Sequence, residues 1–289
     1  MVVKTTLQRF RFASKIVTTS IFLFFLAVVA VSAEAGGSLF DDFDTLISLP
    51  NPAANFWVIN CGDDGCLPRF EADAAKVENL HVPTNLSFAR LSVLPDTTEV
   101  TYNNAEIAEL QTGVNPAALG RWLPTPSHPV VIETRVRWSD DYNQLGLGAI
   151  GTSGVWLWNS PINTGGDDAP INSLGFSWSQ VGSPLVGLHA EVLRNNLIVF
   201  TAQVPPINMQ DWNTFKIVWE AANPVGLTQR VSFYVNGELF GATTPFPALP
   251  ALSLEIWNDN QLFTFAGALF LNPESPQEFD LDYISISQP

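Results

Sequence analysis

Basic residues are scarce in this chain, and their shortage argues against anionic partners. The 289 residues include 13 Lys and Arg against 28 Asp and Glu. A surface with this acidic excess repels phosphate backbones, so we do not expect nucleic acid as a partner. The same excess suits a neutral ligand, a cation or simple solubility.

Cysteine and histidine are also rare, which leaves little material for metal or thiol chemistry. The two cysteines, Cys61 and Cys66, are separated only by Gly-Asp-Asp-Gly. In an oxidising compartment this spacing predicts one local disulfide across a turn. A zinc site would need two further ligands, and His81, His128 and His189 follow no ligand spacing.

Long apolar runs are missing, apart from one near the N-terminus. Basic residues between positions 4 and 15 precede eleven apolar residues, Ile21–Val31, and then Ala33-Glu34-Ala35. This is the three-part pattern of a secretory signal peptide, whereas a membrane anchor needs roughly 20 apolar residues. We expect cleavage after Ala35 and secretion to the extracellular space, the periplasm or the cell wall, with no membrane span in the mature chain.

The mature chain would comprise residues 36–289, which suits one large all-β domain without a repeat or a linker. The leader, residues 1–35, carries four of the 13 basic and one of the 28 acidic residues. That leaves nine basic against 27 acidic residues and a net charge of −18. We expect the mature protein to be a monomer.

Helical periodicity is almost absent, and strand patterns dominate. Only Ala105–Leu110 and Pro116–Leu119 could form a helical turn or two. The sharpest turn signal is Asn236-Gly237, which predicts a hairpin with a type I′ turn. The predicted strands are Leu39–Ile47, Phe56–Asn60, Leu86–Leu94, Val130–Trp138, Val155–Trp158, Leu174–Trp178, Leu188–Leu193, Leu197–Gln203, Phe215–Glu220, Arg230–Val235, Leu239–Thr243, Leu252–Trp257 and Phe279–Ile286.

These strands carry one apolar and one polar row, as in a sandwich or a barrel. Ile132, Thr134 and Val136 lie on one side of their segment and are expected in the core. Glu133 and Arg135 belong to the opposite row, which would face solvent or a groove.

The order of these segments resembles the concanavalin A-like glucanases, the laminarinase and lichenase group called glycoside hydrolase family sixteen. The resemblance implies an all-β, two-sheet antiparallel jelly-roll sandwich with a concave face that binds sugars. It also implies that the opening and closing strands pair. The segments that carry it are Leu39–Phe43, Ile132–Arg137, Gly154–Trp158, Trp212–Trp219, Val231–Gly237, Leu254–Asn258 and Phe279–Ile284.

The family's catalytic motif, Glu-x-Asp-x-Glu, has no counterpart in this chain. In the family one acid attacks the anomeric carbon, one transfers the proton, and the middle one tunes them. Chain order places the motif at Ser173–Ser179, which contains no acid, and Glu191 is the only carboxylate nearby. We therefore expect a protein that binds a glucan-like polysaccharide without cleaving it.

An alternative is a divergent glycoside hydrolase that uses Glu255 and Asp259. These two residues and Trp257 alternate along one strand, so they would face one way. The Cα atoms of the two acids would be roughly 13 Å apart in a flat strand, and an inverting geometry fits more easily than a retaining one. Asp259 could instead cap the backbone in a turn. A third alternative is a structural envelope protein that keeps only the fold.

The resemblance also supplies candidate sugar contacts. Trp257 would stack on a pyranose ring, and Trp156 and Trp178 are further candidates, although large aromatic residues also fill cores. Glu133 and Arg135 match the family's cleft-floor pair and would bind hydroxyls, with a structural ion pair as the alternative.

A structural calcium ion is the one cofactor that the resemblance suggests. The family often holds it near the junction of the first and last strands, where Asp282 is the matching residue. Asp41, Asp42 and Asp280 add negative charge nearby, and carboxylate oxygens suit this ion. A solvated acidic edge is the alternative.

Overall fold

The computed structural model describes residues 38–42, 57–60, 75–82, 86–95, 103–109, 122–159, 170–264 and 267–289, all within one compact unit, Gly36–Pro289. Every regular element in these ranges is a strand, so the described part contains no helix that could span a membrane. The leader, Cys61 and Cys66, and Pro116–Leu119 lie outside the described residues, and the predictions about them stay untested.

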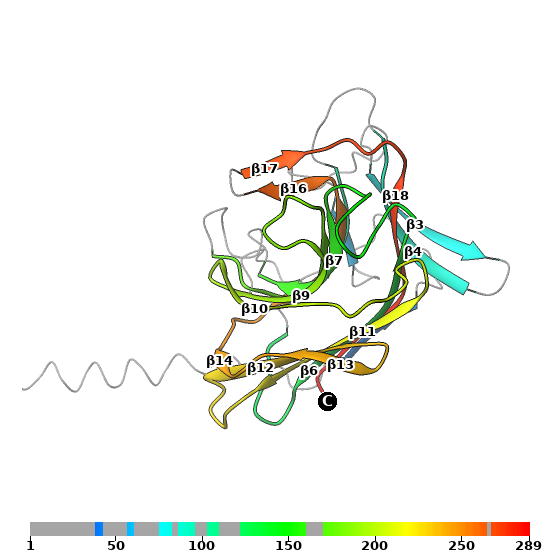
Figure 1. The fold of residues 1–289 in the computed structure, drawn as a ribbon. Helices are drawn as coiled ribbons and strands as arrows, with labels where there is room; N and C mark the ends of the chain where they lie inside the picture. The colour runs from blue at the N-terminus through cyan, green and yellow to red at the C-terminus, as the bar shows by residue number, and fades with distance from the viewer. Residues whose placement is uncertain are drawn as a thin grey trace, which may run out of the picture. The chain divides into compact units, whose positions relative to one another are not determined.

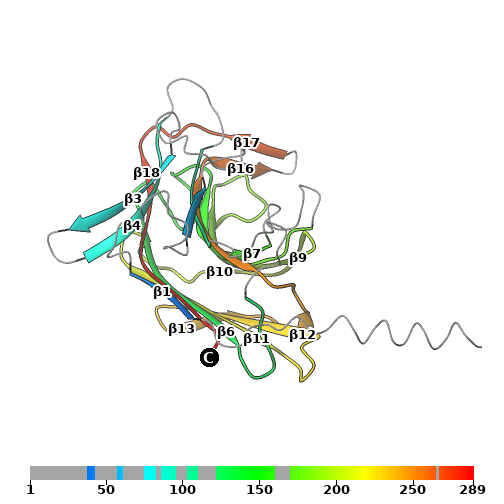
Figure 2. The same ribbon diagram turned by 180° about the vertical axis from the view of Figure 1, so that it is seen from behind.

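The first sheet is antiparallel and has nine strands (Figure 1 and Figure 2). These are β1 (Ser38–Asp41), β3 (Ala75–Val82), β4 (Leu86–Val93), β6 (Val130–Trp138), β11 (Asn213–Ala221), β12 (Thr228–Val235), β13 (Glu238–Ala242), β14 (Phe246–Pro247) and β18 (Gln277–Ser287). Their order is β13-β12-β11-β6-β18-β4-β3, with β1 paired to β18 and β14 to β12.

The second sheet is antiparallel and has seven strands in the order β10-β9-β8-β7-β15-β5-β2. These are β2 (Trp57–Asn60), β5 (Asn104–Glu109), β7 (Thr152–Trp158), β8 (Ser173–Ser179), β9 (Gly187–Arg194), β10 (Leu197–Gln203) and β15 (Ser253–Asp259). A separate hairpin, β16 (Gln261–Thr264) with β17 (Gly267–Phe270), lies beyond this sheet, on the side away from β11 and β12 (Figure 1 and Figure 2).

The two sheets pack face to face around one hydrophobic core. Phe176 of β8 lies between rings of the other sheet, with centroids 4.7 Å from Phe215 and 5.4 Å from Phe233. Ile132 and Val136 are buried in this core, as the alternation predicts. The predicted two-sheet antiparallel sandwich and the pairing of its first and last strands are both confirmed.

One buried amide links the two sheets. Asn258 of β15 points inward, and its Nδ2 donates to the carbonyl oxygens of Leu91 and Gln277, at 3.0 Å each. Its Oδ1 accepts from the Tyr142 hydroxyl at 2.6 Å. Burial, and then the charge of Asp259, raise the pKa of Tyr142 far above its ordinary value, so this hydroxyl remains a donor. The satisfied amide therefore fixes the sheets against each other.

The helical turn expected at Ala105–Leu110 is wrong for its described part, because Ala105–Glu109 belong to β5, and Leu110 lies outside the described residues. Ala105 and Ile107 lie in the core, while Asn104 and Glu106 face the other way. β5 pairs with β15 on one side and with β2 on the other. Pairing with two neighbours outweighs the helix propensity of Ala and Glu.

Replacing Gly237 with alanine tests the predicted hairpin turn, in which Asn236 and Gly237 have φ of 50° and 86°. A Cβ on Gly237 would meet no atom within 4 Å, so its only cost is the positive φ. We expect Gly237→Ala to lower the free energy of unfolding by about 1 kcal/mol in urea denaturation. Glu238→Ala, at the exposed next position, should change it by less than about 0.5 kcal/mol. Equal effects would contradict this turn.

Candidate functional site

The candidate site is the outer face of the seven-stranded sheet, the face that points away from the nine-stranded sheet. Strand alternation directs Phe176 and Ile256 into the core. Trp156, Gly175 and Glu255 therefore lie on the outer face, opposite one another on β7, β8 and β15. This is the face on which the resemblance places the sugar-binding groove.

Three tryptophans form a continuous aromatic cluster on this face. The ring centroid of Trp156 is 5.2 Å from that of Trp158 and 4.2 Å from that of Trp257. Trp257 is only 5% exposed, and its Nε1 donates to Thr152 Oγ1 at 2.8 Å. Trp156 and Trp158 are half-buried. Trp156 and Trp158 therefore leave part of their rings accessible on this face, and the buried ring of Trp257 packs against Trp156.

β8 occupies the place that the resemblance gives to the catalytic strand. Ser173, Gly175 and Ser177 face outward where the family has acids, and all three are buried. A Cβ on Gly175 would collide with the Cβ of Trp156 and with the backbone of Val155. Any side chain at this middle position, an acid included, would collide with these atoms of β7.

Glu191 of β9 brings a carboxylate to the same part of the face. It lies opposite Gly175 and accepts a hydrogen bond from the Ser177 hydroxyl at 2.7 Å. His189 Nε2 lies 3.8 Å from its second oxygen, and both side chains are buried. Glu191 therefore has close polar neighbours from two strands, which the sequence alone did not reveal.

Glu255 is a buried acid with a second acid nearby on the same face. On β15, Trp257 comes two residues after Glu255, and Trp257 lies opposite Glu106 of β5. Glu106 and Glu255 are therefore diagonal neighbours on one face. Burial, and then the negative charge of Glu106, raise the pKa of Glu255 well above its ordinary value. Asn104 Nδ2 donates to Glu106 Oε2 at 2.7 Å. Sequence reasoning missed Glu106 because its segment was read as a helical turn.

The Asp259 carboxylate accepts hydrogen bonds from residues of the neighbouring strands. Its Oδ1 accepts from the Thr152 amide at 3.0 Å, the Thr152 hydroxyl at 2.8 Å and the Gln261 amide at 3.1 Å. These bonds tie β15 to β7 and to the start of β16. Of the alternatives left open by the sequence, these contacts favour backbone capping. Catalysis by Glu255 with Asp259 stays a prediction.

The expectation that Glu133 and Arg135 line the same groove as Glu255 and Trp257 is wrong. They lie on β6, so they face outward from the nine-stranded sheet, on the opposite side of the sandwich. Glu133 Oε1 accepts from the Tyr283 hydroxyl at 2.9 Å, and Arg135 Nη1 pairs with Asp282 at 2.9 Å. The alternation correctly gave the outward row, but a local pattern carries no information about which sheet a strand joins.

Trp178 does not contact sugar on the outer face, because it is a core residue with no exposed surface. Its Nε1 donates to the carbonyl oxygen of Asn143 at 2.7 Å, and its ring meets Tyr142 edge to face, with centroids 4.7 Å apart. On β8 it shares the inward row with Leu174 and Phe176. This expectation is corrected by the same alternation that places Ser173 and Ser177 on the outward row of β8.

The calcium prediction gains no support from the surroundings of Asp282. Its carboxylate is engaged by Arg135, and the described residues contain no group of three His, Cys, Asp or Glu side chains that could hold a metal ion. Calcium at Asp282 therefore stays an untested prediction.

Two buried polar atoms of the strands that form this face, Ser173 Oγ and Asn104 Oδ1, make no hydrogen bond within the described part of the chain, whereas the indoles of Trp156 and Trp158 interact with the Glu255 carboxyl. Ser173 lies opposite Trp158 and therefore diagonal to Trp156. A buried polar group without a partner costs about 1–3 kcal/mol.

Comparison with solved structures shows the fold of the glucanases. The chain is similar to a Bacillus licheniformis β-glucanase, with TM-score 0.50 and 15% identity over 86% of this chain and 97% of that one. It is also similar to a prokaryotic β-1,3-1,4-glucanase (lichenase) derived from a mouse hindgut metagenome, with TM-score 0.51 and 10% identity over 86% and 98%. No protein-family model and no curated protein sequence matches the chain. At these identities the likeness establishes the concanavalin A-like fold alone.

Two small substitutions on β8 should have opposite effects. Gly175→Ala places a methyl group against Trp156 and the backbone of Val155, and we expect it to lower the free energy of unfolding by about 2–3 kcal/mol. Ser173→Ala removes a buried hydroxyl that has no partner, and we expect no loss or a small gain. Thermal and urea unfolding of both variants measure this. An unaffected Gly175→Ala would contradict the close approach of β7 to β8 at this position.

The raised pKa of Glu255 predicts a pH-dependent stability. The native state holds this proton more tightly than the unfolded chain, whose ordinary value is 4.5. The contribution is therefore complete below pH 4.5 and is lost as the pH rises through the native pKa. Glu255→Gln keeps the shape without the charge, so its stability should decline less from pH 4 to pH 8 in urea denaturation.

The control for this experiment is Glu238→Gln, at an exposed position, which should keep the wild-type slope. Parallel pH profiles for wild type and Glu255→Gln would contradict the buried, acid-flanked environment of Glu255.

Proposed function

We propose that this protein is secreted and binds a neutral, glucan-like polysaccharide on the outer face of the seven-stranded sheet, without cleaving it. The observation that carries the proposal is the cluster of Trp156, Trp158 and Trp257 on this face, beside a strand with Ser173 and Gly175 where the family has acids. The fold makes this face the natural place for a sugar chain.

The chemistry of the face suits pyranose rings. The C–H faces of sugars are apolar and pack on indole rings, and the half-buried rings of Trp156 and Trp158 offer such a surface. The net charge of −15 opposes sulfated or carboxylated chains at low salt. A neutral glucan fits both features.

A divergent glycoside hydrolase is the second candidate, favoured by one observation. Glu255 is buried beside Glu106 with a raised pKa, as a general acid requires. Its partner in catalysis would then be Glu106 in place of Asp259, whose carboxylate is engaged by backbone and hydroxyl donors. A purely structural role, the third candidate, is favoured by the burial of every residue of β8 and β15.

Affinity electrophoresis in gels with laminarin, barley mixed-linkage glucan or cellulose derivatives tests the binding proposal. We expect the wild type to be retarded by at least one glucan, and Trp158→Ala to weaken this about tenfold or more by removing a stacking ring. Tyr234→Ala, which removes a half-buried ring from the outward row of β12 in the nine-stranded sheet, should bind like the wild type.

Reducing-end release from the same glucans separates the candidates. Release that Glu255→Gln abolishes would establish the hydrolase and overturn the non-catalytic proposal. Absence of both retardation and release with all glucans would overturn carbohydrate binding and leave the structural role.

A further inference from the structure

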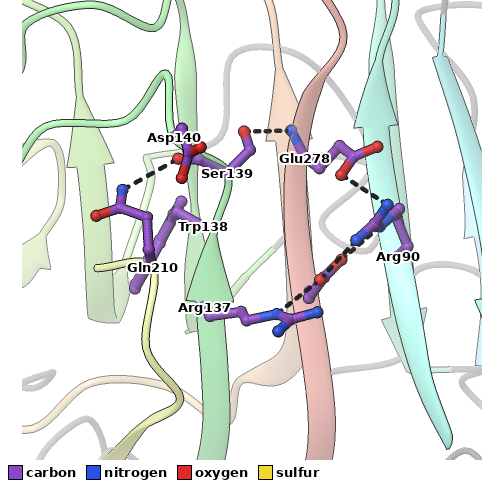
Figure 3. A pocket seen from close by; sticks show the side chains of 8 residues that line it. Arg90, Arg137, Trp138, Ser139, Asp140, Gln210 and Glu278 are labelled. Atoms are coloured by element: carbon purple, nitrogen blue, oxygen red, sulfur yellow. Dashed lines mark hydrogen bonds and ion pairs between the residues drawn. The ribbon is translucent and has the colours of Figure 1, made fainter. Parts of the chain in front are cut away.

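The outer face of the nine-stranded sheet contains a cavity of about 260 Å³ that none of these functions uses. It opens between β4, β6 and β18, and the turn before β11 forms its remaining wall (Figure 3). The residues that matter here are Arg90, Arg137, Asp140, Gln210, Glu278 and Asp280. The volume lies just below that of typical small-molecule sites, which suits one small polar unit.

The arginines of this cavity are held rigidly. Asp280, almost fully buried, accepts from Arg90 Nε and Nη2 at 2.7 and 2.9 Å and from Arg137 Nε at 2.9 Å. Glu278 takes the remaining nitrogen of Arg90 at 2.6 Å. The Arg137 guanidinium also lies 4.5 Å from the ring centroid of Trp212. Binding here would cost little side-chain entropy, because the donors are already in place.

The charges of the cavity disfavour an anion. The two arginines are balanced by Asp280 and Glu278, and Asp140 adds a carboxylate that makes no hydrogen bond or ion pair within the described part of the chain. A sulfate, phosphate or carboxylate group would meet this surplus negative charge at close range. A neutral ligand meets no such penalty.

The hydrogen-bonding groups of the cavity that are still available match a ligand that both donates and accepts hydrogen bonds. The terminal nitrogens of Arg137 can donate, whereas Asp140 can only accept. Gln210 Nε2 is used by the carbonyl oxygens of Ser139 and Tyr142, at 3.2 and 3.1 Å, which leaves its Oε1 to accept. Hydroxyl groups on neighbouring carbons fit this mixture, since each can donate to a carboxylate or amide oxygen and accept from a guanidinium.

We propose that this cavity is a second saccharide site, which binds one neutral sugar unit by its neighbouring hydroxyls. This second site rests on the proposed function, since its ligand would be a unit of the same polysaccharide. The protein then contacts glucan chains on both outer faces of the sandwich, with Arg137 and Asp140 as the main hydrogen-bonding residues of the second site.

Two-dimensional ¹⁵N NMR of the mature protein, titrated with β-1,3-linked and β-1,3-1,4-linked glucotriose, tests both sites at once. The Nε–H signal of Arg137 and the side-chain amide of Gln210 report this cavity, and the indole signals of Trp156 and Trp158 report the other face. We expect both groups of signals to shift. Asp140→Asn should weaken the response of Arg137 about tenfold while the indole response is kept.

Asp141→Asn is the matched control, since Asp141 is the adjacent acid and its Oδ2 accepts from the Ser275 hydroxyl at 2.8 Å. It should leave both responses unchanged. Indole shifts without a response at Arg137 and Gln210 would overturn the second site and leave the proposed function standing. A response at Arg137 alone would uphold the second site and overturn the first. No shift in either group would overturn both.

Discussion

Each strand of this protein buries one of its two rows of side chains between the sheets, and this requirement determines where the polar residues can lie. Phe176 packs between Phe215 and Phe233 of the opposite sheet. A slip of β8 by one residue would exchange this ring and Trp178 for serines in the core. The core therefore sets the register, and the register sets both outer faces.

The two outer faces differ in whether their charged side chains have partners of opposite charge. On the nine-stranded sheet, Arg90, Arg135 and Arg137 each have a carboxylate partner, so its polar ladder is neutralised locally. On the seven-stranded sheet, Glu255 lies beside another acid, and burial opposes its ionisation. One face thus carries fixed ion pairs, and the other combines aromatic rings with a carboxyl that resists ionisation.

What could be predicted from the sequence was local. The turn at Asn236-Gly237 and the alternating rows of β6 follow from conformational preference and from the two-residue period of a strand. Trp178 was also within reach, because it alternates with Leu174 and Phe176 along a row too apolar to face a groove.

Long-range features could not be read from the sequence. Glu133 was assigned to an outward row, but its sheet depends on pairing with β11 and β18, which lie far along the chain. Glu106 was missed because the helix propensity of its segment is a weak preference that pairing with two strands overrides. The lack of room for a side chain at Gly175 likewise becomes visible only once β7 and β8 lie side by side.

The pairing of β6 with β18 has a kinetic consequence. The bond between Tyr283 and Glu133 joins positions 150 residues apart, and β1 docks on the same late strand. The middle of the larger sheet therefore cannot close before the last strand has been synthesised. Such high contact order slows folding, and until closure the unpaired edges remain open to association with other chains.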